Sequence, residues 1–140
     1  MEDKIFADSN IWLYALMENG EKKKAAAAII INNKCILSTQ IVNEVCVNLI
    51  KKADYGEEDI SKLVENLYSN YKIEVIDKDI ILKSSAIRKN LAVSYWDSLI
   101  ISSALGSGCK ILYTEDMHHN HIIEGKLKII NPFRLVGHPH

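Results

Sequence analysis

The chain has 140 residues, of which 48% are hydrophobic and 25% charged, and its formal net charge is −1. This length can bury a core without disulfides or metals, and the composition is that of a globular domain rather than a disordered chain. The near-neutral charge excludes binding to nucleic acid through overall charge, so any such contact must use local basic patches. We predict a single domain over residues 1–136, followed by a short tail over 137–140.

Possible targeting segments and the cysteine pattern indicate the compartment in which we expect the protein to reside. No apolar stretch approaches the roughly 18 residues that a membrane span needs. The acidic N-terminus, MEDKIFADSN, lacks the character of a signal or transit peptide. Cys35, Cys46 and Cys109 lie far apart within apolar segments and form no CxxC pair. We therefore expect reduced, buried thiols in a cytoplasmic protein that has no membrane partner.

The hydrophobic pattern alternates between short β-like runs and longer helical ones. In chain order, we predict a strand over 5–7, helices over 9–18 and 21–33, a strand over 35–37, helices over 39–53 and 57–71, a strand over 73–76, helices over 78–90 and 94–105, and strands over 110–113 and 128–130. Short, continuously apolar strands between helices indicate a parallel sheet covered on both faces. The predicted fold class is therefore α/β, a three-layer α/β/α sandwich with a central, mainly parallel sheet.

Polar side chains follow several of these strands at the point where each strand ends. Asp8 follows the first strand, Ser38 and Thr39 follow the second, and Thr114 to Asp116 follow the strand over 110–113. In open α/β sheets, ligands bind beyond the carboxyl ends of the strands. We therefore expect these polar residues to converge on one edge of the sheet.

Each candidate acid also has a purely structural interpretation. Asp8 either caps a helix that starts near Ser9 or forms one wall of a charged site. Asp116 is either a loop acid or a ligand. Ser94 lies three residues before Asp97, which is the spacing of a capping box.

The helix over 39–53 leaves the role of Glu44 open. Its apolar stripe consists of Ile41, Val42, Val45 and Leu49. Glu44 falls on the polar side together with Gln40, where a solvated face and a groove-facing carboxylate fit equally well. Tyr95 and Trp96, which precede Asp97, are more typical of a core than of a stacking platform for a base.

Taken together, the four acids favour metal chemistry. Carboxylates crowded at one sheet edge raise each other's pKa unless a cation neutralises them. Hard oxygen ligands suit Mg²⁺ or Mn²⁺, and such ions activate water and stabilise the leaving oxygen of a phosphodiester. The chain has no glycine-rich phosphate loop, GxSxG elbow or HExxH motif. A phosphatase with an aspartyl nucleophile would carry a second acid where this chain has Asn10.

Four separated motifs resemble, in order and spacing, those of PIN-domain proteins, and in particular the VapC-type toxins of bacterial and archaeal toxin–antitoxin pairs. The motifs are IFADSNIWLYAL (5–16), STQIVNEVCVNLIKK (38–52), SYWDSLIISSALGSGCKILYTEDM (94–117) and IINPF (129–133). The resemblance implies a PIN fold with an acidic ribonuclease site that binds Mg²⁺ or Mn²⁺. It also implies RNA as substrate, a homodimer, and an antitoxin whose tail enters the acidic groove.

The resemblance assigns roles to individual positions. Asn10 and Thr114 match polar positions that support the acids by hydrogen bonding. Glu115 could share the role of its neighbour, although adjacent residues leaving a strand tend to point in opposite directions. The acids that would hold the metal and serve catalysis are Asp8, Glu44, Asp97 and Asp116.

After the TEDM segment the chain departs from the family. Relatives often carry a glutamine, histidine, glycine run there, whereas this chain has His118, His119, Asn120 and His121. These histidines either touch substrate or metal, or form an inert surface loop.

Basic residues around the groove would position RNA phosphates, with Lys51 and Lys52 as the first candidates. The remaining basic clusters, each of which also reads as a solvated face, are Lys22–Lys24, Arg88–Lys89, Lys126, Lys128 and Arg134. The sequence thus predicts a metal-dependent endoribonuclease, the toxin of a type II toxin–antitoxin pair. The alternatives are a non-catalytic PIN domain that binds RNA or protein, and a phosphatase-like hydrolase of small phosphoesters.

Overall fold

A computed structural model describes residues 3–17 and 20–134, and within these ranges the chain forms six helices and one six-stranded sheet. The strands are β1 (Lys4–Ala7), β2 (Lys34–Ser38), β3 (Lys72–Glu74), β4 (Ile111–Tyr113), β5 (Ile122–Ile123) and β6 (Leu127–Ile130). The helices are α1 (Ser9–Met17), α2 (Glu21–Asn32), α3 (Thr39–Ala53), α4 (Glu57–Asn70), α5 (Lys78–Asn90) and α6 (Tyr95–Gly106). The predicted end of the first helix at Glu18, the domain end at 136 and the tail over 137–140 lie outside the described residues.

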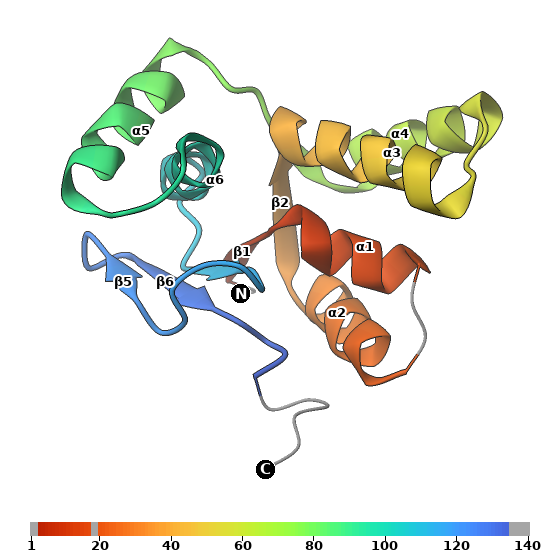
Figure 1. Cartoon of the computed structure of the whole chain (residues 1–140), viewed down its shortest axis with the longest axis horizontal. Helices are drawn as coiled ribbons and strands as arrows, with labels where there is room; N and C mark the ends of the chain where they lie inside the picture. Colours follow the sequence, from red (N-terminus) through yellow and green to blue (C-terminus); the bar gives the residue numbers. More distant parts are fainter. Residues whose placement is uncertain (1–2, 18–19, 135–140) are drawn as a thin grey trace.

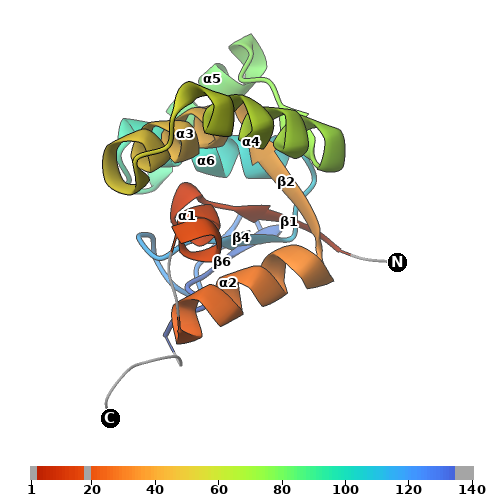
Figure 2. The same cartoon turned by 90° about the vertical axis from the view of Figure 1, so that its right-hand side faces the viewer.

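The sheet has the strand order β3-β2-β1-β4-β6-β5, so β1 lies in its interior (Figure 1). All neighbouring pairs are parallel except β5 with β6. Figure 2 shows α2 on one side of the sheet and α3 to α6 on the other. The predicted α/β class with a mainly parallel central sheet is confirmed.

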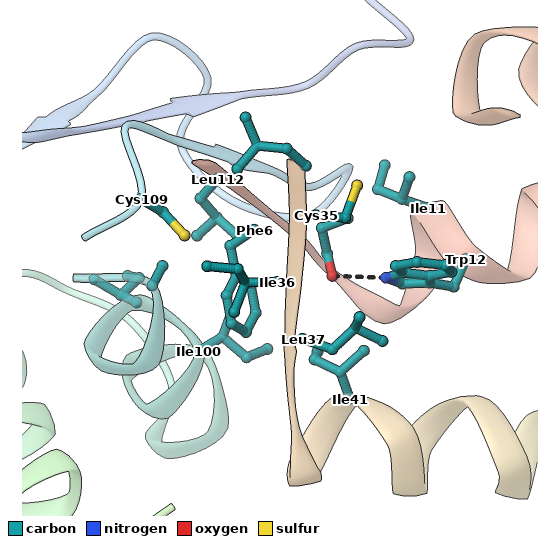
Figure 3. Packing of buried hydrophobic residues seen from close by; sticks show 14 of the residues in the cluster. Phe6, Ile11, Trp12, Cys35, Ile36, Leu37, Ile41, Ile100, Cys109 and Leu112 are labelled. Carbon is teal, nitrogen blue, oxygen red and sulfur yellow. Dashed lines mark hydrogen bonds between the residues drawn. The ribbon is translucent and has the colours of Figure 1, made fainter. Parts of the chain in front are cut away.

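The core fixes where β1 ends. Phe6 of β1 lies between Ile36 of β2 and Leu112 of β4, and all three side chains are fully buried (Figure 3). The indole nitrogen of Trp12 donates a hydrogen bond of 3.2 Å to the carbonyl of Ala7. Since Trp12 belongs to α1, this bond holds the helix against the last residue of the strand. The turn at residue 8 is therefore anchored on both sides.

Apart from shifts of one or two residues at the ends of elements, two details differ from the sequence prediction. The antiparallel strand β5 was not predicted, because two residues are too few to show a period of two. The structure forms it through a turn in which Glu124 and Gly125 both have positive φ, 55° and 66°. Among the cysteines, all of which are free, Cys35 and Cys109 are buried as expected, but Cys46 is only half-buried.

Within residues 3–17 and 20–134, no helix is both long and apolar enough to cross a membrane.

Candidate active site

Asp8 is buried at the junction of β1 and α1, with only 4% of its surface exposed. One carboxylate oxygen, Oδ1, accepts a hydrogen bond of 2.7 Å from the backbone N–H of Ser9. The other, Oδ2, accepts one of 2.7 Å from the hydroxyl of Thr114. Burial nevertheless dominates and raises the pKa of Asp8 from its ordinary 3.8 to about 6, with further increases from Glu44 and Asp97. Asp8 therefore binds a helix-start amide, as the cap interpretation predicted, and also carries a strongly destabilised charge.

Thr114 and Asn10 connect Asp8 to Asp116. The Thr114 hydroxyl, which donates to Asp8, also accepts a bond of 3.2 Å from the backbone N–H of Asp116. The Asn10 amide donates to Oδ2 of Asp116 at 2.9 Å, and its carbonyl oxygen lies 3.4 Å from the backbone nitrogen of Glu115. Both residues thus make the kind of supporting contact that the resemblance implies. They join the start of α1 to the loop that follows β4.

Glu44 and Gln40 link α3 to the start of α6. The Gln40 amide donates to the Glu44 carboxylate at 2.9 Å and to the carbonyl of Trp96 at 3.4 Å. Glu44 is half-buried, so it is neither a freely solvated acid nor a core residue. Gln40 is buried, with 9% exposed, although it lies on the polar side of the helical wheel. An i, i+4 pair is visible in the sequence, but its burial depends on the approach of α6.

Asp97 occupies the first turn of α6. The hydroxyl of Ser94 accepts a hydrogen bond of 3.0 Å from the Asp97 N–H, which confirms Ser94 as the helix cap. Burial is the main cause that raises the pKa of Asp97, a hydrogen bond with the Ser94 side chain opposes it, and the charges of Asp116 and Glu44 raise it further. The capping and the electrostatic interpretations therefore both hold for this residue.

The four acids form one electrostatic group. Asp8 feels the charges of Glu44 and Asp97, and Asp97 feels those of Asp116 and Glu44. In the described part of the chain, no salt bridge reaches any of these four carboxylates.

A divalent cation fits this group by charge and by donor type. The available donors are carboxylate oxygens, which hard cations such as Mg²⁺ and Mn²⁺ prefer. As the side chains stand, no three His, Cys, Asp or Glu residues within 3–17 and 20–134 converge closely enough to hold a metal ion. The fit thus rests on the chemistry of the residues and on their unneutralised charge rather than on a preformed ligand cage.

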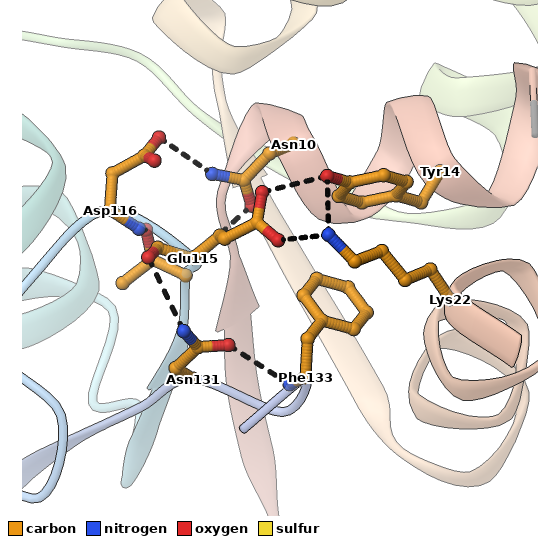
Figure 4. Close-up of polar contacts among 8 residues, drawn as sticks. Asn10, Tyr14, Lys22, Glu115, Asp116, Asn131 and Phe133 are labelled. Carbon is orange, nitrogen blue, oxygen red and sulfur yellow. Dashed lines mark hydrogen bonds and ion pairs between the residues drawn. The ribbon is translucent and has the colours of Figure 1, made fainter. Parts of the chain in front are cut away.

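Glu115 is directed away from this group. Its carboxylate forms an ion pair of 2.8 Å with Lys22 and accepts a hydrogen bond of 2.8 Å from the hydroxyl of Tyr14 (Figure 4). The Lys22 ammonium also lies over the rings of Tyr14 and Phe133, at 4.8 and 5.5 Å from their centroids. As predicted from strand alternation, Glu115 and Asp116 point to different partners.

Tyr95 and Trp96 are exposed, which overturns their assignment to the core. Trp96 has 63% of its surface exposed and Tyr95 46%. The two rings meet edge to face at 5.3 Å, and the Arg88 guanidinium lies 4.5 Å from the Tyr95 centroid. Both residues sit at the start of α6, ahead of its buried stretch from Ser98 to Ala104. The prediction from aromatic character alone was therefore wrong for both residues.

The predicted basic residues and the histidines lie in different parts of the structure. Lys51 and Lys52 are both exposed in the last turn of α3, and Lys52 lines a hollow with Asn10 and Tyr14.

The histidines lie in the loop between β4 and β5. The Nδ1 atom of His119 accepts a bond of 2.9 Å from the Asn131 N–H, while His118 and His121 are exposed. None of the hydrogen bonds formed within the described residues joins these histidines to the acids.

Comparison with known proteins identifies the family. The model of the PIN domain family matches residues 5–124, and the chain belongs to that family. No curated protein sequence matches the chain.

Solved structures share the fold. A chain from a toxin–antitoxin complex of Klebsiella pneumoniae superposes with a TM-score of 0.69 at 23% identity, over 91% of this chain and 97% of that one. VapC20 of Mycobacterium tuberculosis, described as a toxin that cleaves the sarcin–ricin loop, gives 0.62 at 12% identity over 77% and 86%. A chain of VapBC2 from Rickettsia felis, bound to a DNA fragment of its promoter, gives 0.59 at 19% identity over 91% and 99%.

Proposed function

We propose that the protein is a Mg²⁺- or Mn²⁺-dependent endoribonuclease that hydrolyses RNA phosphodiester bonds, and that it is the toxin of a type II toxin–antitoxin pair. One observation carries the proposal. The acids Asp8, Glu44, Asp97 and Asp116 interact electrostatically, yet none is paired with a basic side chain in the described residues. Such a group costs folding free energy, and a bound divalent cation would offset that cost.

The residues of the chain contribute specific roles to this chemistry. A cation bound by the four acids would supply activation of water and neutralisation of charge on the phosphate. Asp8 is held by Ser9 and Thr114, so its carboxylate enters the reaction already oriented. Asn10 orients Asp116 through its amide in the same way. Gln40 positions Glu44 against the start of α6.

The test is cleavage of RNA by the purified chain with and without Mg²⁺ or Mn²⁺. We expect metal-dependent cleavage that Asp8→Asn reduces by about 100-fold or more, a scale typical of removing one group that stabilises developing charge. Equal activity of the wild type and Asp8→Asn, or activity that survives chelation, would contradict the proposal.

If the chain does not cleave RNA, the result favours a non-catalytic PIN domain. In that case the chain would bind RNA without cleaving it, and Mn²⁺ would not raise its melting temperature. A chromogenic phosphoester that is hydrolysed in place of RNA would instead support a phosphatase-like hydrolase.

We also propose a cognate antitoxin as partner and a homodimeric assembly. An apolar hollow of about 190 Å³ between α1, α2 and α4 supports a protein partner. It is lined by Leu16 and Ile31, which are 37% and 78% exposed, and by the buried Leu67. Exposed apolar surface of this kind is typical of interaction sites. Co-purification with the product of a short neighbouring gene tests the antitoxin, and light scattering of the free chain tests the dimer.

A further inference from the structure

A cavity adjoins the acidic group, and all of its lining residues except Glu44 are uncharged. It measures about 490 Å³ and lies between the start of α3, the segment after β3 and the start of α6. Its lining residues are Thr39, Gln40, Asn43, Glu44, Ile76 and Trp96. Glu44 belongs to both the cavity and the acidic group, and Trp96 directly precedes Asp97. A ligand in this cavity would therefore lie next to the site proposed for hydrolysis.

One wall is an aromatic ring with an open face. Trp96 is 63% exposed, although a tryptophan normally buries most of its surface. Its neighbour Tyr95 contacts it edge to face, and Arg88 lies over the Tyr95 ring. Arg88 is itself held by a hydrogen bond of 2.7 Å to Ser98 within α6. The Trp96 ring is thus supported from one side, which suits a surface on which a planar group stacks.

Gln40, one of the lining residues of the cavity, carries an unpaired polar atom. The Oε1 atom of Gln40 is buried and has no hydrogen-bond partner within the described residues. The orientation of this amide follows from its contacts, because its nitrogen faces two acceptors, the Glu44 carboxylate and the Trp96 carbonyl. The free atom is therefore an acceptor. A buried acceptor without a partner is destabilising, and a donor on a ligand that reached this atom would relieve that cost.

We propose that this cavity binds one unstacked base of single-stranded RNA, next to the phosphate that is hydrolysed. The base stacks on Trp96, and an N–H group on its edge donates to Oε1 of Gln40. The exposed amide of Asn43 and the hydroxyl of Thr39 supply further hydrogen-bonding groups at the rim. This inference rests on the proposed function, because it names the part of the substrate that the site would recognise.

A nucleobase matches this lining better than an apolar peptide segment does. Amide side chains read base edges through paired donors and acceptors, and aromatic rings stack on any base. Ile76 is the one aliphatic residue among the lining residues described. A protein segment would instead need several apolar contacts to gain comparable affinity.

Tryptophan fluorescence provides the test. The chain has two tryptophans, and Trp12 is buried with its indole nitrogen bonded, so quenching by a stacked base reports on Trp96. The probes are a mixed-sequence RNA hexamer and an abasic sugar-phosphate hexamer, added with Mg²⁺ to the full chain carrying Asp8→Asn to prevent cleavage. We expect the RNA to quench the fluorescence and the abasic strand not to.

Three further variants separate stacking from general effects. In the same Asp8→Asn chain, Trp96→Ala should weaken RNA binding about five- to 150-fold, measured by fluorescence anisotropy of labelled RNA. Trp96→Phe should retain most of the affinity. Tyr68→Ala, which removes another exposed aromatic ring, on α4, is the matched control and should have no effect. Gln40→Met, which cannot accept the hydrogen bond, should weaken binding about two- to tenfold.

Cleavage kinetics distinguish the two proposals. If the chain cleaves RNA, Trp96→Ala in the otherwise wild-type protein should raise KM and leave kcat nearly unchanged. Suppose that Trp96→Ala cleaves RNA with an unchanged KM and that the abasic strand binds as tightly as RNA. These results would overturn the base site and leave the ribonuclease proposal standing. Base-dependent quenching without any cleavage would uphold the base site and overturn the ribonuclease. If Trp96→Ala lost binding to a protein partner but kept its affinity for RNA, that result would also overturn the base site.

Discussion

Two neighbouring residues, Glu115 and Asp116, show how differently this protein treats its carboxylates. Glu115 has a lysine at 2.8 Å and a tyrosine hydroxyl at the same distance, so its charge is neutralised within the fold. Among the residues that the structure describes, Asp116 is bonded only by uncharged groups, the Asn10 amide on its side chain and Thr114 on its backbone. Asp8 likewise has no basic partner among the described residues, and its charge is more destabilising because the side chain is also buried. Within the described residues, the fold therefore provides a cation for one acid and none for the adjacent group, which we propose depends on a cation from outside.

The largest effect that this contrast predicts concerns activity. Asp116→Asn should lower the kcat for RNA cleavage by about 100-fold or more, because it removes a charge that supports the reaction. Glu115→Gln, the matched change one residue away, should alter kcat less than about threefold, since its carboxylate is already occupied. Initial rates at saturating RNA with Mn²⁺ measure both. Equal losses in the two variants would remove the distinction between the two acids.

The second prediction concerns stability and pH. The folded-state pKa of Asp8 is about 6, above its ordinary 3.8, so folding is favoured while the group is protonated. The contribution of Asp8 should therefore destabilise the metal-free wild type progressively as the pH rises from about 4 to 7. Asp8→Asn stays neutral and avoids that loss. Its free energy of unfolding at pH 8 should exceed that of the wild type by an amount on the order of 3 kcal/mol.

Urea unfolding in EDTA at several pH values measures this difference. The gap between wild type and Asp8→Asn should close near pH 4 and should shrink when Mn²⁺ is added at pH 8. A variant that is less stable than the wild type at pH 8 in EDTA would show that Asp8 stabilises the fold instead.

The third prediction tests the neutralised acid. Glu115→Gln should lower the free energy of unfolding by about 1 kcal/mol, because Lys22 loses a half-buried ion pair. The control is Glu21→Gln, whose ion pair with Lys24 is largely exposed at 3.7 Å and should contribute almost nothing. Urea unfolding at low and high salt checks both. No loss in either variant would mean that the Lys22 contact does not stabilise the fold.

The smallest predicted effect separates two adjacent lysines. Lys52 lines a hollow with Asn10 and Tyr14. Lys52→Ala should weaken RNA binding about threefold and reduce the slope of log affinity against log salt by about 0.7. Lys51→Ala should change the slope less, and equal slopes for the two variants would contradict this placement.

The sequence predicted the fold well because apolar periodicity and strand length dictate it. It also placed Asp8 and Asp116 correctly relative to their strands, since residues that follow parallel strands meet at one edge. The prediction was wrong for Trp96, and it left the burial of Gln40 open. Whether Gln40 is buried and Trp96 exposed depends on how α3 and α6 approach each other, and the pattern within one helix does not contain that information. Local patterns thus located the acids, while tertiary contacts decided which side chains surround them.

Binding of Mn²⁺, followed by electron paramagnetic resonance at neutral pH, tests the central claim most directly. The claim is that Asp8, Glu44, Asp97 and Asp116 depend on an external cation and that Glu115 does not. Wild type and Glu115→Gln should bind Mn²⁺ with the same affinity, and Asp8→Asn should bind at least about tenfold more weakly. Equal binding by all three proteins, or no binding by the wild type at millimolar Mn²⁺, would contradict it.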